Sequence, residues 1–519
     1  MPTQPGGDMS QGSTGGVAGM TALSVATVTA DGGQCREAIV QVSALTGGRS
    51  LVAVGPEGAS RPELSDRVYA GIRNTGLTWP DRNIVISFAP AGTWPVPPSA
   101  DLAVTVGVLA AMGHVPFTAL SETMFFGEVG LDGAVRPVRD TLALVAAAAD
   151  LGYDTVVVPA ANARQAMLVP GAHVIAVNSL RELVTWATTG TEPPLPALPG
   201  DIATADKGSA EADLMHLPAW MTPAAFALEV AAAGRHHLGV SAAPEFPVAL
   251  IGEQLRSLLP DLDDRQAVQV SGLHAAAGYP VDALIRRPPL MVPGITISVS
   301  SMIGGRRPGV VSLAHRGVLL LRDAADFAPE VLHALRQPLD RRIVQLAHAR
   351  GTTTFPADIQ LIATSRPCLC STGHSASHEC SPPAGRSSRS QLRAISDRLD
   401  IAVTIAATSG AATAGEPIAT VAARVAAART AAAARWTQKG FSANAEVTKD
   451  VLWRPTFRIP ASATEGLRRL LDAGQMSARA YGRVLRLAWT VSDLRGAGRP
   501  DRDAVDTAVE LHHPQRHTS

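Results

Sequence analysis

The stretch His237–Gly252, HLGVSAAPEFPVALIG, decides the fold, because it is typical of a short buried strand, a loop and a helix. A phosphate-binding loop has this arrangement: glycines make a tight turn, backbone N–H groups and a lysine face phosphate, and a Ser or Thr binds Mg²⁺. The loop here instead contains Ala242, Ala243, Pro244, Glu245, Phe246, Pro247, Val248 and Ala249. The stretch therefore predicts a P-loop α/β fold without the side chains that phosphate binding requires.

Length and composition indicate the number of domains and the class of protein. A chain of 519 residues is too long for one core and is expected to form about three domains. Lys+Arg and Asp+Glu are equal at 45 each, so any nucleic-acid surface has to be local. The N-terminus does not resemble a signal peptide, and no apolar run is long enough to predict a membrane helix. We therefore expect a cytoplasmic protein with no membrane partner.

The first part of the chain, residues 20–190, predicts an α/β domain, because helical and strand patterns alternate along it. Asp132-Gly133 is a hairpin signal within this domain. The expected strands are 38–42, 84–88, 155–158 and 174–177, and the expected helices are 100–112, 142–149 and 160–168.

A Pro-rich and polar linker at 191–217 precedes a second α/β domain at 218–435. Its expected elements are a helix from Thr222 to Gly234, strands at 238–240, 317–321 and 360–363, and a hairpin within Arg341–Phe355.

Residues 436–512 predict a helical lid. Ser462 and Glu465 have the spacing of a capping box, and Ser477 is a candidate start for a helix over 478–494. Residues 1–19 and 513–519 are expected to be tails.

Motifs along the chain follow the order and spacing of one family: GEVGLDGAVRPVR (127–139), FALEVAAAGRHHL (226–238), SLAHRGVLLL (312–321), FPADIQLIATSRPCLC (355–370), SDRLDI (396–401) and MSARAYGRVLRLA (476–488). They resemble magnesium-chelatase-like AAA+ ATPases of the competence-type subfamily, often called ComM or YifB. Such proteins join a Lon-protease-like α/β domain to a P-loop AAA+ core and a C-terminal helical domain. The resemblance implies an ATP-driven hexameric ring that acts on DNA branch structures in recombination or transformation.

The phosphate-binding loop departs from this family. Its Gly-Pro-Pro-Gly-x-Gly-Lys-Thr falls on Ala242–Ala249, where only Pro244 is retained. Val248 replaces the lysine and Ala249 replaces the threonine that binds Mg²⁺.

The other parts of the same site are altered as well. After the strand GVLLL the family's Asp-Glu pair becomes Arg322 and Asp323, and its sensor Asn becomes Arg366. Asp323 is a candidate base, but it is shorter than Glu and has no organised metal beside it. Phosphoryl transfer depends on positioning and charge stabilisation, so we expect hydrolysis to be lost. ATP and Mg²⁺ remain implied by the resemblance alone; a helix N-terminus attracts anions, whereas Glu245 opposes them.

Two arginines match the family pattern. Arg398 falls on the arginine that reaches a neighbouring subunit's phosphate, and Arg479 falls on the lid arginine that senses nucleotide. The alternative is that both pair with carboxylates such as Asp397 or Asp400 and hold an interface or the lid.

A cluster of cysteines and one histidine suggests a metal site. Cys368, Cys370, His378 and Cys380 could bind structural Zn²⁺ as three thiolates and an imidazole, with His374 as a competing ligand. The alternative is a loop of free thiols.

In the Lon-like domain, Ser99 falls near the protease nucleophile, but Leu142 occupies the place of its lysine. We expect no protease activity and assign Ser99 as a helix cap.

Arg341, Arg342 and Arg350 lie on or beside the expected hairpin and are candidate DNA contacts. Together these features favour a hydrolysis-deficient scaffold or regulatory subunit, in a homo-oligomer or in a ring with an active paralogue. An active DNA branch-migration motor and a duplicate without a maintained role are the alternatives.

Overall fold

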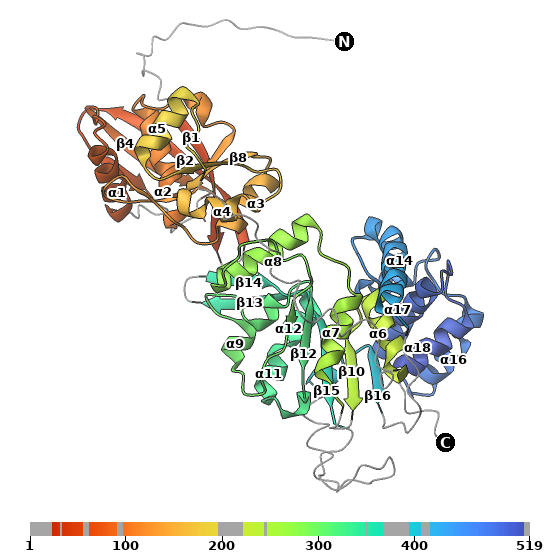
Figure 1. Ribbon diagram of the computed structural model, residues 1–519. Helices are drawn as coiled ribbons and strands as arrows, with labels where there is room; N and C mark the ends of the chain where they lie inside the picture. Colours follow the sequence, from red (N-terminus) through yellow and green to blue (C-terminus); the bar gives the residue numbers. More distant parts are fainter. Residues whose placement is uncertain are drawn as a thin grey trace, which may run out of the picture. The chain divides into compact units, whose positions relative to one another are not determined.

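The computed structural model describes residues 23–31, 34–54, 62–90, 97–195, 222–242, 246–348, 351–366, 394–405 and 416–512. The chain divides into two compact units, the first reaching Leu198 and the second beginning at Pro199 (Figure 1). The expected tails and most of the expected linker lie outside the described residues.

The first unit contains a four-stranded sheet in the order β1-β2-β4-β3. Its strands are β1 (Leu23–Asp31), β2 (Gln34–Thr46), β3 (Leu51–Val54) and β4 (Arg82–Ala89). Helices α1 (Pro62–Asn74) and α2 (Asp101–Ala111) share a hydrophobic core with this sheet. Both strands expected here are confirmed, with longer bounds than the sequence predicted.

A second, parallel sheet completes this unit, in the order β5-β8-β9. It consists of β5 (Thr123–Phe125), β8 (Thr155–Pro159) and β9 (His173–Val177), with helices α3 (Thr141–Asp150), α4 (Ala163–Ala166) and α5 (Leu180–Thr189). The expected hairpin pairs β6 (Glu128–Val129) with β7 (Val135–Arg136), and Gly133 supplies the positive φ of +80° that its turn needs.

Ser99 is not the helix cap that the sequence predicted. It lies inside a 3-10 turn, Pro98–Ala100, and the cap of α2 is Ala100, without a side-chain hydrogen bond. Ser99 is buried, and its carbonyl accepts a hydrogen bond from the Gly127 N–H (2.9 Å). Leu142 is fully buried in α3. Ser99 therefore has a structural role in the core of this unit.

The second unit is built on a parallel sheet in the order β11-β12-β15-β10-β16. Its strands are β10 (Leu238–Ala242), β11 (Leu290–Met291), β12 (Val318–Leu321), β15 (Gln360–Ser365) and β16 (Ile401–Ile405). Because all strands run the same way, their carboxyl ends form one edge of the sheet. The loop after β10, Arg322 after β12 and Arg366 after β15 all follow that edge.

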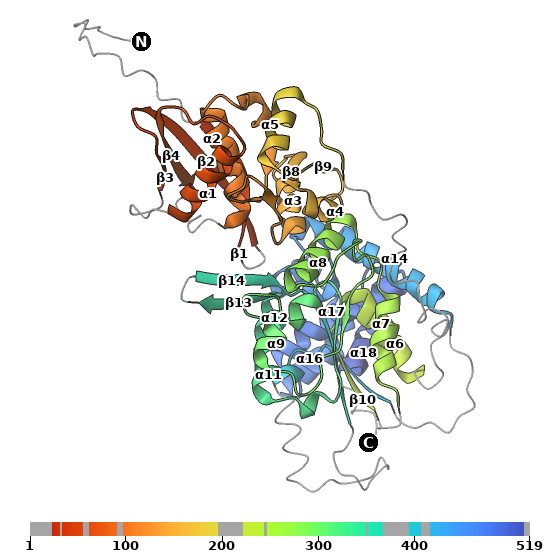
Figure 2. The same ribbon diagram turned by 60° about the vertical axis from the view of Figure 1, so that its left-hand side comes forward.

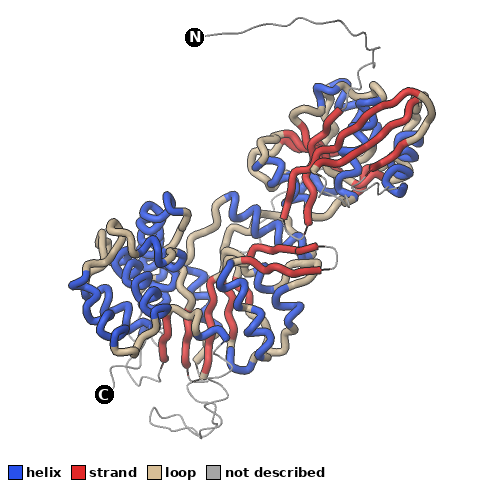
Figure 3. The backbone as a smooth tube through the Cα atoms, turned by 180° about the vertical axis from the view of Figure 1, so that it is seen from behind, coloured by secondary structure: helices blue, strands red, loops and turns tan. Residues whose placement is uncertain are grey.

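Helices and one hairpin surround this sheet. The helices of the core are α6 (Thr222–Gly234), α7 (Ala249–Leu258), α8 (Asp264–Ala277), α9 (Val299–Ile303), α10 (Val310–Leu313), α11 (Pro329–Ala334) and α12 (Arg336–Arg341). Strands β13 (Ile343–His348) and β14 (Gly351–Pro356) form the expected hairpin, which is separate from the parallel sheet (Figures 2 and 3).

The C-terminal helices are α14 (Ile418–Trp436), α15 (Lys449–Leu452), α16 (Ala461–Asp472), α17 (Ala478–Leu494) and α18 (Arg502–His512). They share one hydrophobic core with α6, β10 and β16, and the buried Trp436 contacts Trp489 edge-on within it. Ser477 caps α17 as expected, because its hydroxyl accepts a hydrogen bond from Ala480 N–H. The capping box at Ser462 is wrong: α16 begins two residues earlier, with Pro460 as its cap. The structure confirms an α/β fold with a helical C-terminus.

Candidate functional site

Backbone amides of the loop between β10 and α7, and of the first turn of α7, donate hydrogen bonds to carbonyl groups of the same segment. The Val248 N–H donates to the Phe246 carbonyl (2.8 Å), Leu250 N–H to Pro247 (2.9 Å) and Ile251 N–H to Val248 (3.2 Å). In a phosphate-binding loop such groups are directed at the ligand. The amides available to a phosphate are therefore fewer than the strand–loop–helix pattern alone suggests.

The described side chains of this loop provide no other group that could bind phosphate. Val248 is half-buried and packs against the hydrophobic core, and Ala249 is exposed at the start of α7. Neither carries a charge or a hydroxyl group. Pro244 and Glu245 lie outside the described residues.

Two altered positions at the carboxyl edge of the sheet pair with each other. Arg366 Nε lies 3.3 Å from Asp323 Oδ1, and both side chains are partly exposed. Asp323 has a positive φ of 51°, and its N–H donates to the Thr364 hydroxyl on β15 (3.1 Å). The neighbouring Arg322 is exposed. The candidate base is thus bound to a guanidinium, and at the positions of the P-loop lysine and threonine the described residues Val248 and Ala249 supply neither a cation nor a hydroxyl group for Mg²⁺–ATP.

Comparison with known proteins identifies the family of this chain. Three family models match the chain: subunit ChlI of Mg-chelatase over residues 40–162, magnesium chelatase, subunit ChlI over 221–413, and its C-terminal domain over 415–512. The uncharacterized protein Rv2897c of Mycobacterium tuberculosis is 37% identical over 88% of this chain and 92% of its own length. The chain belongs to the magnesium-chelatase-like family.

Two further relatives refine this assignment. The competence protein ComM of Haemophilus influenzae is 26% identical over 88% of this chain and 91% of its own length. This places the chain with the ComM/YifB group of the magnesium-chelatase-like family. Lon protease 2 of Bacillus subtilis is 30% identical over 23% of this chain and 21% of its own length, in agreement with a Lon-like segment.

Arg398, a residue that matches the magnesium-chelatase-like pattern, is held within its own chain. Its Nε and a terminal nitrogen bind the two carboxylate oxygens of Asp340 on α12 (2.8 and 2.5 Å), and the other terminal nitrogen binds the Ala394 carbonyl (3.0 Å). The expected partners, Asp397 and Asp400, are not the ones used. Asp400 is buried instead and accepts a hydrogen bond from His237 N–H (3.1 Å).

Arg479, the second such arginine, is exposed in the first turn of α17. Within the described ranges it has no carboxylate partner. Its role in sensing nucleotide stays a prediction.

The candidate DNA arginines fall into different environments. Arg341 is exposed at the end of α12. Arg342 caps that helix with a positive φ of 59°, and its side chain is partly exposed, with a terminal nitrogen 3.2 Å from Glu446. Arg350 lies outside the described residues. Arg342 is therefore paired with an acid of its own chain, and its role in DNA binding stays a prediction.

An ion-pair network missed by sequence reasoning surrounds Arg342. Arg235 binds Asp358 (2.9 Å) and Glu446 (3.1 Å), and Arg316 binds Asp358 (3.0 Å). Burial by itself raises the pKa of Asp358, but Arg235, Arg342 and Arg316 together lower it to about 2. The network joins the amino edge of the parallel sheet to the helical C-terminus.

The candidate zinc ligands Cys368, Cys370, His378 and Cys380 lie outside the described residues, as does His374. Within the described part of the chain no group of three or more His, Cys, Asp or Glu could hold a metal ion. Cys35 is partly buried, and burial, with a smaller effect of Asp140, raises the pKa of its thiol to about 11. None of the helices that the structure describes is long and apolar enough to cross a membrane.

Proposed function

We propose that this protein is a hydrolysis-deficient member of the magnesium-chelatase-like family that acts as a scaffold or regulatory subunit in DNA recombination or transformation. The pairing of Asp323 with Arg366 carries the proposal, because it occupies the acid that would otherwise activate water. Val248 and Ala249 support it, since they leave no cation or hydroxyl for Mg²⁺–ATP.

The proposed assembly is a ring, formed by copies of this chain or shared with an active paralogue in the cytoplasm. Family membership supports the ring. The pairing of Arg398 with Asp340 argues that this arginine serves its own subunit and does not reach a neighbour's phosphate.

A surface of the helical C-terminus supports nucleic-acid binding. Trp453 is 50% exposed, and its ring lies parallel to that of Tyr481 with centroids 6.1 Å apart. The Arg458 guanidinium lies 5.7 Å from the Trp453 ring. Exposed aromatic rings beside arginines stack on unpaired bases and bind phosphates. This arrangement suits DNA junctions, where the base pairs that border the branch point can present unstacked faces.

The test is binding of the full-length protein to a four-way DNA junction and to a linear duplex, across a salt series, with and without Mg²⁺–ATP. We expect salt-sensitive junction binding that ATP does not change. Trp453→Ala should weaken junction binding more than duplex binding. Absence of junction binding, or binding only when ATP is present, would contradict the proposal.

A further inference from the structure

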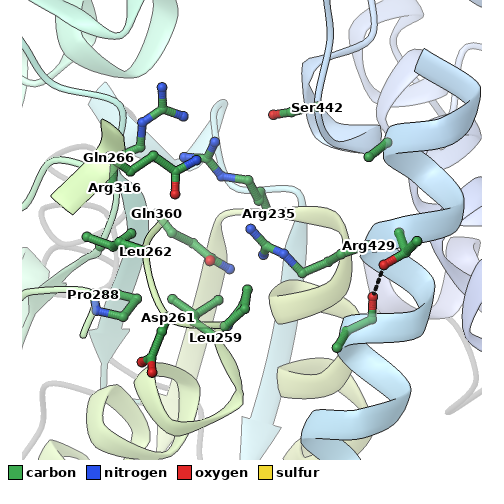
Figure 4. Close-up of a pocket in the computed structure, with 15 residues that line it drawn as sticks. Arg235, Leu259, Asp261, Leu262, Gln266, Pro288, Arg316, Gln360, Arg429 and Ser442 are labelled. Atoms are coloured by element: carbon green, nitrogen blue, oxygen red, sulfur yellow. Dashed lines mark hydrogen bonds between the residues drawn. The ribbon is translucent and has the colours of Figure 1, made fainter. Parts of the chain in front are cut away.

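A cavity of about 330 Å³ lies in the second unit at the amino edge of the parallel sheet. Arg235 precedes β10, Arg316 precedes β12, and Gln360 is the first residue of β15; α14 closes the cavity with Arg429 (Figure 4). The loop that replaces the P-loop follows the opposite, carboxyl ends of the strands. The cavity is therefore distinct from the candidate nucleotide site.

Positive charge is in excess around this cavity. Arg235, Arg316 and Arg342 share the two carboxylates of Asp358 and Glu446. Arg429 adds a fourth guanidinium, so four positive charges lie near two negative ones, and of these six groups Arg235, Arg316 and Arg429 line the cavity.

Among the described residues that line the cavity, Asp261 is the acid, and it does not restore the balance. Asp261 is exposed, and its carboxylate points away from the guanidinium groups of Arg235, Arg316 and Arg429, which line the same cavity (Figure 4).

Arg429 is the least compensated of these groups. Its one hydrogen bond within the described residues runs to the Ala232 carbonyl (2.8 Å), and it has no carboxylate partner there. Burial, followed by the charge of Arg235, lowers the pKa of Arg429 to about 10. The Nε of Arg316 is also buried without a hydrogen-bond acceptor. A part-buried cation without a bound carboxylate is incompletely compensated, so the site favours an anion.

We infer that this cavity binds the phosphate group of a small molecule, either inorganic phosphate or a small phosphate ester. Guanidinium groups match phosphate oxygens in charge and geometry, and three of them line this cavity. The Gln266 amide and the Ser442 hydroxyl also line the cavity. The volume is at the lower end of small-molecule pockets.

A phosphate held there would join two parts of the second unit. Arg235 and Arg316 belong to the core, whereas Arg429 and Ser442 belong to α14 and the segment that follows it. Bound phosphate would therefore fix the helical C-terminus against the amino edge of the sheet.

The experiment measures unfolding temperature and binding heat of the full-length protein in sodium phosphate or sodium chloride at equal ionic strength. Wild type should bind phosphate saturably and unfold at a higher temperature in phosphate. Arg429→Met should weaken phosphate binding about tenfold or more, because it removes a charged hydrogen-bond donor. Arg454→Met, a change at an exposed arginine of the same unit, should bind phosphate like wild type.

The chloride arm separates a binding role from a structural one. Without phosphate, Arg429→Met should unfold at the wild-type temperature or above it, because it removes an uncompensated charge. Equal loss of stability in both salts would show that Arg429 only holds the Ala232 carbonyl, and would overturn the inference. Equal effects of phosphate and chloride on wild type would overturn it as well.

Ribose 5-phosphate, in a parallel titration, identifies the source of the phosphate. Tighter binding than inorganic phosphate indicates an ester that fills the cavity; equal or weaker binding indicates free phosphate. In either case Arg429→Met should weaken the binding. Binding that Arg429→Met leaves unchanged would contradict the assignment of the site.

Discussion

Arg366 and Asp323 form an ion pair across the ends of β15 and β12, with Nε 3.3 Å from Oδ1. By the resemblance, these residues replace an uncharged sensor Asn and an activating Glu. The two replacements therefore compensate each other in charge. An acid that remained alone at this edge could bind a metal or water, whereas this one binds an arginine.

Arg366→Asn restores the residue that the family has at this position. We expect a stability change below about 1 kcal/mol, because the pair is partly exposed. We also expect no hydrolysis, since Val248 and Ala249 still lack the charge and hydroxyl that Mg²⁺–ATP needs. Urea denaturation and phosphate release check the two expectations. Hydrolysis by this single variant would show that Arg366 alone silences the site.

Asp358→Asn should destabilise the second unit by about 3 kcal/mol, because three arginines lose one of the two carboxylates that they share. Asp81→Asn is the control, since Asp81 forms an exposed pair with Arg49 and should cause no measurable change. Chemical denaturation measures both. Similar small effects would mean that the buried network contributes little to stability.

Three strands of the parallel sheet in the second unit, β10, β12 and β15, could be predicted because they are short apolar runs, whereas β11 and β16 were not predicted. The ion-pair network at its amino edge was not predicted, since its members are far apart in the sequence. A signal was nevertheless present: Arg316 and Asp358 each lie two residues before a buried strand. The amino ends of parallel strands share one edge, so these charges had to meet.

Other misses have local causes. Ser462 and Glu465 have the spacing of a capping box, but Pro460 suits the start of α16 and the helix begins there. Arg342 follows a helix in a basic run and is partly exposed, as expected for a surface residue. It also pairs with Glu446 and Asp358, which spacing alone does not show.

Stability of the second unit should fall as pH is lowered from 7 to 5. Nδ1 of His315 accepts the Asp358 N–H, and Nδ1 of His237 accepts the Leu361 N–H, so both rings must be neutral. Burial, above all, lowers their pKa values, to about 3 for His315 and about 4 for His237.

These lowered pKa values determine the direction in which the unfolding free energy changes with pH. The unfolded chain takes up protons near pH 6.5 and the folded chain does not, so stability is present above that pH and is lost below it. The loss at pH 5 should be roughly 1–2 kcal/mol for each ring. The double variant His237→Asn, His315→Asn keeps an acceptor oxygen and should flatten the pH profile of the unfolding free energy. An unchanged profile would contradict the assignment.

Arg341→Ala and Arg342→Ala should separate DNA binding from stability. Arg341 is exposed, so its loss should lower the salt dependence of DNA binding without changing the unfolding midpoint. Arg342 is bound to Glu446 and Asp358, so its loss should lower the midpoint. The reverse pattern would place Arg342 on the DNA surface.

Zinc binding by Cys368, Cys370, His378 and Cys380 remains a prediction from the sequence. Purified protein should contain one equivalent of zinc, and Cys368→Ser with Cys370→Ser should remove it. Metal analysis of protein purified without added zinc is the measurement, with Cys35→Ser as the matched control. Zinc-free wild-type protein would favour free thiols.

The central claim is that the nucleotide site no longer turns over ATP, and steady-state phosphate release by the full-length protein tests it most directly. The assay contains Mg²⁺–ATP, with and without a four-way DNA junction, and compares wild type with Asp323→Ala. We expect both proteins to match the protein-free background under every condition. Magnesium-dependent turnover by wild type that Asp323→Ala abolishes would contradict the account and establish an active motor.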